Sequence, residues 1–262
     1  MFALDFKLDT GDKNVGTVYL PHKDATDIPV IIYCHGWGGN RGLRPSAKGF
    51  CDRAIEENIA FVAFDFFGCG DTGGDYGYMT YARWKENLSD VVDWVAEQPF
   101  SAKNKIGCFA ISSGTTAALR LAAENCKLSF IISVATCASA YFNMQAGGPA
   151  KILVDNLGSL VVGGTAKIFD IDFGLEFFVD TISNAPIHSV GRIQCPVLFL
   201  QGTADNAYRN ADAKMAHDTM MCSDPGSKTV FAPIEGGDHS LDNAVDEAVN
   251  VAYEWLYAGY LV

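Results

Sequence analysis

Large apolar side chains occupy every second position from Phe2 to Leu8, with small or charged residues between them. A period of two is typical of a strand that is buried on one face. The polar segment 9–14 then leads into a second run of this kind at 15–20. The chain is therefore predicted to open with an antiparallel hairpin.

Six later runs are apolar at nearly every position, which is typical of strands that helices cover on both faces. They span residues 29–34, 60–66, 105–111, 128–135, 195–201 and 228–234. Segments with apolar residues at helical spacing separate several of these runs. They cover residues 80–97, 113–125, 207–221 and 241–257. Thr80 and Ser240 are expected to cap the first and the last of these helices.

The alternation of strands and helices predicts an α/β fold with a mostly parallel, doubly wound sheet, opened by the antiparallel hairpin. One connection is unusually long, because about 60 residues separate Ala135 from Cys195. We expect residues 141–189 to form an inserted lid or cap. Residues 1–140 and 190–262 are then expected to form one core.

Composition narrows the partners of the protein. The chain has 262 residues and a formal net charge of −12, with 49 % hydrophobic and 19 % charged residues. These proportions suit a compact globular protein. The acidic surplus repels phosphate backbones and anionic lipid heads, so neither nucleic acid nor a membrane is an expected partner. The eight cysteines contain no C-x-x-C pair, and the N-terminal segment lacks the apolar stretch of a signal peptide. We therefore expect a reduced, cytoplasmic protein.

A candidate nucleophile follows the apolar run 105–111, where the chain turns directly into a helix. A sharp turn of this kind requires small residues two positions before and two positions after the nucleophile. Ser112 has Ala110 and Gly114 at these places, whereas Ser113 would have two β-branched residues. Ser112 is therefore the candidate nucleophile. The alternative is that the two serines only cap the helix.

A serine hydroxyl becomes a nucleophile when a base removes its proton and an acid orients that base. His239 lies in a Gly-rich loop between the last strand and the last helix, which brings it to the same edge of the sheet as Ser112. It is the candidate base, with an ordinary loop histidine as the alternative. Asp205 closely follows the strand at 195–201 and is the candidate acid. Asp238 is a rival for that role, and Asp205 could instead serve only as a helix cap.

The tetrahedral oxyanion of an acyl transfer needs hydrogen-bond donors. The sequence HGWGG follows the strand at 29–34, and its glycines allow backbone amides to turn into the crevice. The amides of Trp37 and Ser113 are the expected oxyanion hole. The residues expected to support this loop are His35, Gly36, Gly38 and Gly39. His35 is expected to hold the loop by a hydrogen bond rather than to transfer a proton, and a simple glycine turn is the alternative for the whole motif.

Together these motifs resemble the α/β-hydrolase superfamily over essentially the whole chain. HGWGG resembles its oxyanion loop, AISSGT its nucleophile elbow, and GTADN and GGDHS its acid and histidine loops. The order Ser112, Asp205, His239 is also the order of the superfamily. Ala110 departs from the usual pattern, which has glycine there. Within the superfamily, the chain is similar to small bacterial carboxylesterases of the feruloyl and cinnamoyl esterase type, which carry a compact lid at the place of residues 141–189.

The resemblance implies a serine hydrolase that cleaves a small carboxylic ester through a Ser-His-Asp triad and an acyl-enzyme, without a cofactor. A peptidase or acyltransferase with the same triad and a catalytically silent binding protein of the same fold are the alternatives. The negative charge favours a neutral ester with an apolar acyl or aromatic part. The sequence leaves open whether the protein is a homo-oligomer.

Aromatic residues of the expected lid have two interpretations: they line an apolar acyl pocket, or they form the core of the lid itself. The candidates for a lid pocket are Tyr141, Phe142, Phe173 and Phe177. Residues 68–73 satisfy the dinucleotide pattern G-x-G-x-x-G, but no helix follows to bind a pyrophosphate. A metal site is not expected either, because no second histidine stands at ligand spacing from His239.

Overall fold

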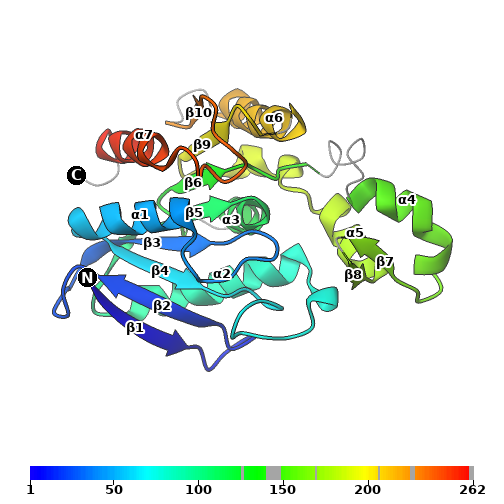
Figure 1. The fold of residues 1–262 in the computed structure, drawn as a ribbon, viewed down its shortest axis with the longest axis horizontal. Coiled ribbons are helices and arrows are strands. Elements are labelled where there is room, and N and C mark those ends of the chain that lie inside the picture. The colour runs from blue at the N-terminus through cyan, green and yellow to red at the C-terminus, as the bar shows by residue number, and fades with distance from the viewer. Residues whose placement is uncertain (125–126, 140–148, 169, 206, 225–227, 260–262) are drawn as a thin grey trace.

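A computed structural model describes residues 1–262 apart from 125–126, 140–148, 169, 206, 225–227 and 260–262 (Figure 1). Within the described residues, eight strands form one sheet in the order β1-β2-β4-β3-β5-β6-β9-β10. The strands span Phe2–Lys7 (β1), Val15–Leu20 (β2), Ile28–Cys34 (β3), Ala60–Phe64 (β4), Ser101–Ile111 (β5), Ile131–Val134 (β6), Val197–Gly202 (β9) and Val230–Ile234 (β10). β2 is antiparallel to β1 and β4, and the other neighbours are parallel. The predicted α/β fold, with a mostly parallel sheet opened by a hairpin, is confirmed.

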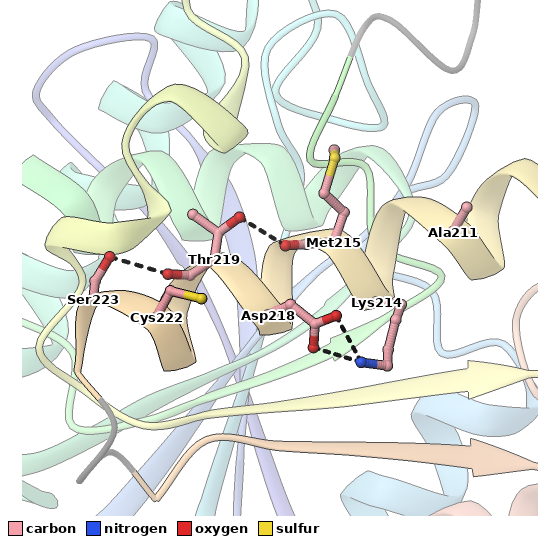
Figure 2. Close-up of a pocket in the computed structure, with 7 residues that line it drawn as sticks. All are labelled: Ala211, Lys214, Met215, Asp218, Thr219, Cys222 and Ser223. Atoms are coloured by element: carbon pink, nitrogen blue, oxygen red, sulfur yellow. Dashed lines mark hydrogen bonds and ion pairs between the residues drawn. The ribbon is translucent and has the colours of Figure 1, made fainter.

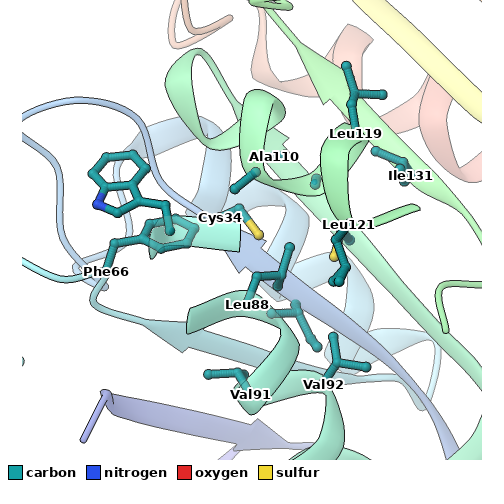
Figure 3. Packing of buried hydrophobic residues seen from close by; sticks show 14 of the residues in the cluster. Cys34, Phe66, Leu88, Val91, Val92, Ala110, Leu119, Leu121 and Ile131 are labelled. Carbon is teal, nitrogen blue, oxygen red and sulfur yellow. The ribbon is translucent and has the colours of Figure 1, made fainter. Parts of the chain in front are cut away.

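Helices cover both faces of this sheet (Figure 1). The helices packed on it are α1 (Pro45–Glu56), α2 (Tyr81–Glu97), α3 (Ser113–Glu124), α6 (Ala207–Ser223) and α7 (Val245–Tyr257). Successive side chains of β3 point to opposite faces, as the period of a strand requires. Ile31 and Tyr33 pack with residues of α1 and α7, whereas Val30 and Ile32 pack with residues of α2, α3 and α6. Figure 3 shows part of this second cluster.

The ends of two helices test the predicted caps. Thr80 caps α2, since its side-chain oxygen accepts a hydrogen bond from the backbone N–H of Arg83 at 3.1 Å. The last helix begins at Val245 after Ala244, so the prediction that Ser240 caps it is wrong. The reason is a turn before the helix, in which Asp238 accepts the N–H groups of Ser240 and of the residue two positions later. This turn holds the loop that presents His239.

The described part of the expected lid contains two helices and a small antiparallel sheet beside the main sheet (Figure 1). Its elements are α4 (Pro149–Leu160), β7 (Ala166–Ile168), β8 (Ile171–Phe173) and α5 (Leu175–Ser183), followed by short 3₁₀ turns at Pro186–His188 and Val190–Arg192. Another short 3₁₀ turn, Tyr76–Tyr78, precedes α2. None of the helices within the described ranges is long and apolar enough to cross a bilayer.

Candidate active site

Ser112 stands at the turn between β5 and α3 with a left-handed backbone, φ +54°. This conformation is costly for a residue with a side chain, and it is common at functional turns. The close approach of the turn to β3 explains the small residue that follows. A Cβ added to Gly114 would lie 2.3 Å from the carbonyl oxygen of Cys34 and 2.6 Å from that of His35. The turn therefore requires glycine at 114.

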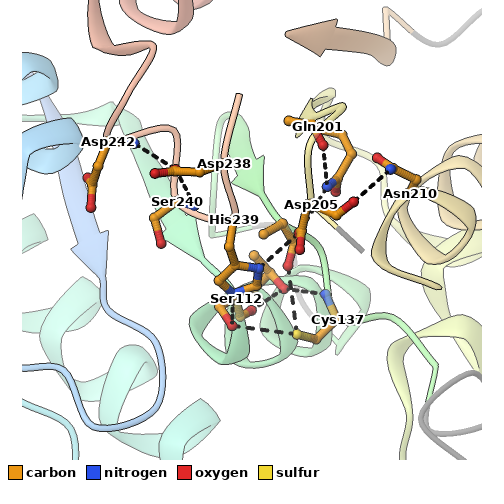
Figure 4. A network of polar contacts seen from close by, with 12 residues as sticks. Ser112, Cys137, Gln201, Asp205, Asn210, Asp238, His239, Ser240 and Asp242 are labelled. Atoms are coloured by element: carbon orange, nitrogen blue, oxygen red, sulfur yellow. Dashed lines mark hydrogen bonds and ion pairs between the residues drawn. The ribbon is translucent and has the colours of Figure 1, made fainter. Parts of the chain in front are cut away.

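His239 lies between Ser112 and Asp205 (Figure 4). Its Nε2 is 3.0 Å from Ser112 Oγ, and its Nδ1 is 2.9 Å from Asp205 Oδ2. An ionised carboxylate only accepts hydrogen bonds, so it favours the imidazole with the proton on Nδ1. Nε2 is then free of its proton and can accept the Ser112 hydroxyl proton. The three candidate residues are thus in hydrogen-bond contact in the order that general-base chemistry requires.

The loops that carry Asp205 and His239 are held together through glycines. A Cβ added to Gly202, at the end of β9, would lie 2.2 Å from the carbonyl oxygen of Gly237. The side chain of Asp205 is only 5 % exposed, whereas that of His239 is 42 % exposed. The candidate base is therefore open to solvent, while the candidate acid is shielded from it.

Asp238, the rival candidate for the acid, hydrogen-bonds to the backbone of its own loop. Its carboxylate accepts hydrogen bonds from the backbone of Ser240 at 3.1 Å and of Asp242 at 3.0 Å (Figure 4). These bonds organise the turn that presents His239. The carboxylate in contact with the His239 ring is that of Asp205.

The loop expected to form the oxyanion hole lies directly against Ser112. A Cβ added to Gly36 would be 3.1 Å from Ser112 Cβ, so the Gly36–Trp37 peptide passes beside the candidate nucleophile. Gly38 has φ +65°, a conformation that favours glycine. Ser113 is the first residue of α3, and N–H groups in the first turn of a helix have no partner within the helix. The structure thus places the loop of Trp37 and the first residue of α3 beside the candidate nucleophile.

His35 is buried beneath this loop and makes edge contacts with the rings of Phe66 and Trp84, which stack on each other. Burial lowers its pKa to about 4, so the ring is neutral near pH 7. The backbone N–H of Phe66 donates to Nε2 at 3.1 Å, which leaves the proton on Nδ1, 2.9 Å from the carbonyl oxygen of Gly36. His35 therefore fastens the loop to the chain after β4, as its sequence context suggests.

A buried ion pair fastens the same loop at its far end. Asp65 is fully buried directly after β4 and accepts hydrogen bonds from Arg41 Nη1 and Arg41 N, at 2.5 and 2.6 Å, and from Asp71 N at 2.9 Å. A Cβ added to Gly70 would lie 2.2 Å from this carboxylate. Sequence reasoning missed the pair, although a lone aspartate inside the apolar run at 60–66 was a signal for it.

Two further residues near the site were also missed. Gln201, buried on β9, donates from Nε2 to Asp205 Oδ2 at 3.1 Å (Figure 4). Its signal was an amide within an otherwise apolar strand. Cys137 follows β6, and its Sγ lies 4.0 Å from Ser112 Oγ. No sequence pattern marked this cysteine.

A cavity of about 370 Å³ opens beside the candidate triad. Its lining residues are Tyr33, His35, Gly36, Trp37, Gly39, Asn40, Gly42, Arg44, Ile111, Ser112, Ser113, His239 and Ser240. Another hollow, of about 610 Å³, lies along α6 and is lined by residues of that helix alone (Figure 2). The first cavity is lined by the candidate nucleophile and the candidate base, and it is the candidate substrate site.

Two of the four aromatic candidates for a lid pocket, Phe173 and Phe177, are described, and neither is part of the lining of that cavity. Tyr141 and Phe142 lie outside the described residues. Phe173 and Phe177 are 0 % and 2 % exposed and pack against the indole of Trp37. Among the described residues, no three His, Cys, Asp or Glu side chains come together to hold a metal ion.

Comparisons with known proteins bear on the fold of the chain. The "Quorum-quenching protein AidA" of Acinetobacter baumannii is 25 % identical over 241 residues, 75 % of this chain and 76 % of the relative. The α/β hydrolase GrgF from Penicillium sp. sh18 has a TM-score of 0.77 at 15 % identity, with all of both chains covered. Est1E from Butyrivibrio proteoclasticus, solved with ferulic acid bound, has a TM-score of 0.71 at 17 % identity, covering 95 % of this chain and 98 % of that one.

The predicted α/β-hydrolase fold is therefore confirmed at the level of the whole chain. A sequence model of the X-Pro dipeptidyl-peptidase (S15 family) matches residues 11–160, which include the Gly-rich loop at 35–39 and Ser112. The match spans more than half of the 262 residues. The chain belongs to the X-Pro dipeptidyl-peptidase (S15) family, a hydrolase family with the α/β-hydrolase fold.

Proposed function

We propose that the protein is a serine hydrolase that cleaves a small carboxylic ester through Ser112, His239 and Asp205. The observation that supports this proposal is the position of His239, 3.0 Å from Ser112 Oγ and 2.9 Å from Asp205 Oδ2. The strained backbone at Ser112 supports it too, because such strain persists where the surrounding structure requires it.

In the proposed reaction, His239 Nε2 takes the hydroxyl proton of Ser112 as Oγ attacks the ester carbonyl. The carbonyl oxygen becomes an oxyanion, which accepts hydrogen bonds from the amides of Trp37 and Ser113. The carbon–oxygen bond to the alcohol then breaks, and the alcohol leaves with the proton from His239. Asp205 holds the ring in the required tautomer and stabilises its transient positive charge.

The acyl group remains on Ser112 Oγ until water replaces it. His239 takes a proton from the water as its oxygen attacks the acyl carbon, and a second oxyanion forms in the same place. When this intermediate collapses, the bond to Oγ breaks and His239 returns the proton to Ser112. The products are a carboxylic acid and the free enzyme, and no cofactor takes part.

A peptidase is the second candidate, and the family match supports it directly. The same residues can cleave a peptide bond, because an amide differs from an ester only in its leaving group. The ester proposal is supported by the fold that the chain shares with Est1E, which was solved with ferulic acid bound. An acyltransferase uses the same acyl-enzyme with an alcohol or amine in place of water.

The finer properties of the substrate are part of the proposal. The formal charge of −12 disfavours anions, so we propose a neutral ester with an apolar acyl or aromatic part. We also propose that residues 141–189 act as a lid over the site, because Phe173 and Phe177 in this segment contact Trp37. A cytoplasmic location stays a prediction.

A fluorophosphonate probe tests the nucleophile, since it modifies an activated serine covalently. We expect the wild type to be labelled and Ser112→Ala to be unlabelled, with Ser113→Ala as the neighbouring control at the labelling step. A catalytically silent protein would leave all three unlabelled and overturn the proposal. Acetyl, butyryl, octanoyl and hydroxycinnamoyl esters and an X-Pro dipeptide anilide then separate an esterase from a peptidase. Faster turnover of the anilide than of every ester would assign the peptidase.

A further inference from the structure

The indole of Trp37 is packed between the catalytic core and the lid segment. Its centroid lies 5.5 Å from the ring of Phe173 on β8, with the two planes only 13° apart. Phe177 on α5 lies 5.6 Å from the same indole, and 4.3 Å from Phe173. The ring of Tyr76 also contacts the indole of Trp37, and their centroids are 6.3 Å apart. Stacked aromatic pairs of this kind fix orientation as well as burying surface.

The helix that carries Phe177 is itself fastened to α3. Asp180 lies one turn after Phe177, and both of its oxygens are 3.1 Å from Nη1 of Arg120. These side chains are 10 % and 8 % exposed. Asp180 also accepts the backbone N–H of Ala82 at the start of α2, at 3.1 Å. Breaking a buried pair of this kind is costly, so the pair holds α5 of the lid segment firmly against α3.

These contacts connect the two expected oxyanion donors. α3 begins at Ser113, the first donor, and Arg120 on the same helix holds Asp180. Phe177 on the helix of Asp180 packs on Trp37, the second donor. The loop of Trp37 contains several glycines, and glycine backbones are conformationally permissive. Its side-chain contacts must therefore contribute to the position of its amide.

We infer that Phe173 and Phe177 are positioning residues for the oxyanion hole, which hold the amide of Trp37 at a set distance from that of Ser113. The inference rests on the proposed function and assigns the lid segment a part in the chemical step. Oxyanion donors act because they are already oriented when the charge develops, and shifts well below the length of a hydrogen bond weaken them. Phe173 and Phe177 do not touch the substrate in this role.

The test compares Phe173→Leu and Phe177→Leu with the wild type on a short-chain p-nitrophenyl ester. Leucine keeps the apolar bulk but removes the aromatic stack. We expect kcat to fall by about tenfold to hundredfold while KM stays within about twofold, because the oxyanion exists only after attack. Phe178→Leu is the matched control: Phe178 is equally buried on α5, and its ring lies against Phe177 at 5.3 Å rather than against Trp37. We expect it to keep the wild-type kcat.

A trifluoromethyl ketone inhibitor gives a second readout. Ser112 Oγ adds to its carbonyl carbon, the hydroxyl proton passes to His239, and the carbonyl oxygen becomes an anion in the oxyanion hole. We expect this inhibitor to bind the two leucine variants more weakly by the same factor as the fall in kcat. A general loss of folded protein would lower the amount of active enzyme but would leave the inhibition constant unchanged.

Trp37→Leu removes the other ring of the same stack, the one on the loop, and keeps the backbone amide. The double variant with Phe173→Leu should have a kcat no lower than that of Trp37→Leu alone, because both substitutions remove the same contact between the two rings. If the two phenylalanine variants match Phe178→Leu in kcat and in inhibitor affinity, the positioning role is wrong although the proposed hydrolase stands. If the wild type neither turns over an ester or amide nor reacts with the fluorophosphonate, the proposed function itself fails, and the positioning role with it.

Discussion

Gln201 donates a hydrogen bond from its side-chain amide to Asp205 Oδ2 at 3.1 Å. The same oxygen lies 2.9 Å from His239 Nδ1, so one carboxylate oxygen receives both groups. Gln201 is 1 % exposed and comes from β9, a central strand that cannot easily move. The orientation of the candidate acid therefore depends on a strand residue as well as on its own loop.

Gln201→Leu should lower kcat/KM by about tenfold, because hydrogen bonds to charged groups contribute about 1.5–3 kcal/mol. The carboxylate loses the donor that fixes its plane, and His239 is then held less well. Steady-state kinetics on a short-chain ester measure the effect. Gln98→Leu is the control, since the side-chain amide of Gln98 donates to the Trp94 carbonyl at the end of α2. Equal kinetics in the two variants would remove Gln201 from the machinery.

Asp205→Asn should lower kcat by about a thousandfold or more, because the amide group favours the wrong tautomer of His239. Asp238→Asn should leave kcat roughly unchanged, since the Asn oxygen can still accept the N–H groups of Ser240 and Asp242. Asp205 lies in the loop after β9 and Asp238 in the loop after β10, next to His239. Each variant therefore controls for the other. A larger loss in Asp238→Asn would reassign the acid.

The sequence was sufficient to predict the sheet and to bring Ser112, Asp205 and His239 to one edge of it. Parallel strands place the loops after their carboxyl ends together, so residues at these loops meet even when they are far apart in the chain. The small residues around Ser112 also selected it over Ser113, and Ser112 is the serine whose Oγ lies 3.0 Å from His239 Nε2. These inferences needed only the order of the strands and local sterics.

The supporting contacts could not be predicted in the same way. Gln201, Asp65 and Arg41 act through partners distant in the sequence, and nothing local indicates those partners. The small lid elements were not predicted, because strands of three residues such as β7 and β8 are too short to show a period. Ser240 is of a residue type that often caps helices, but its backbone N–H donates to Asp238 in the turn before the helix. Tertiary context decided each of these cases.

Gly114→Ala should destabilise the protein by about 3 kcal/mol, because its Cβ would lie 2.3 Å from a backbone oxygen of β3 that cannot move aside. Gly38→Ala should cost only about 1 kcal/mol. A Cβ added there meets no atom within 4 Å beyond its chain neighbours, so the cost is that of the positive φ alone. Chemical denaturation measures both. Equal losses in the two variants would show that the contact with β3 does not require glycine at 114.

His35 should make the stability depend on pH. Burial lowers its pKa to about 4 in the folded protein, against an ordinary value of 6.5 in the unfolded chain. Between these values the unfolded chain binds a proton that the folded protein does not, so the free energy of unfolding falls by roughly 3 kcal/mol as the pH drops from 6.5 to 4. Stability from this residue is fully present above pH 6.5. His35→Gln should reduce the slope in this window, and the exposed His22→Gln should leave it intact. Denaturant titrations at several pH values test this difference.

Arg41 pairs with two carboxylates whose exposure differs, which allows a matched comparison within one cluster. Asp65 has no exposed side-chain surface, whereas the side chain of Asp71 is 70 % exposed. Arg41→Ala should destabilise the protein by about 3 kcal/mol, because it leaves a buried carboxylate without its cation. Asp71→Ala should cost less than about 1 kcal/mol, as exposed ion pairs do. Because Arg41 fastens the end of the loop that carries Trp37, Arg41→Ala should also lower kcat. Equal effects of the two variants on unfolding would mean that the pair with Asp65 does not hold the loop.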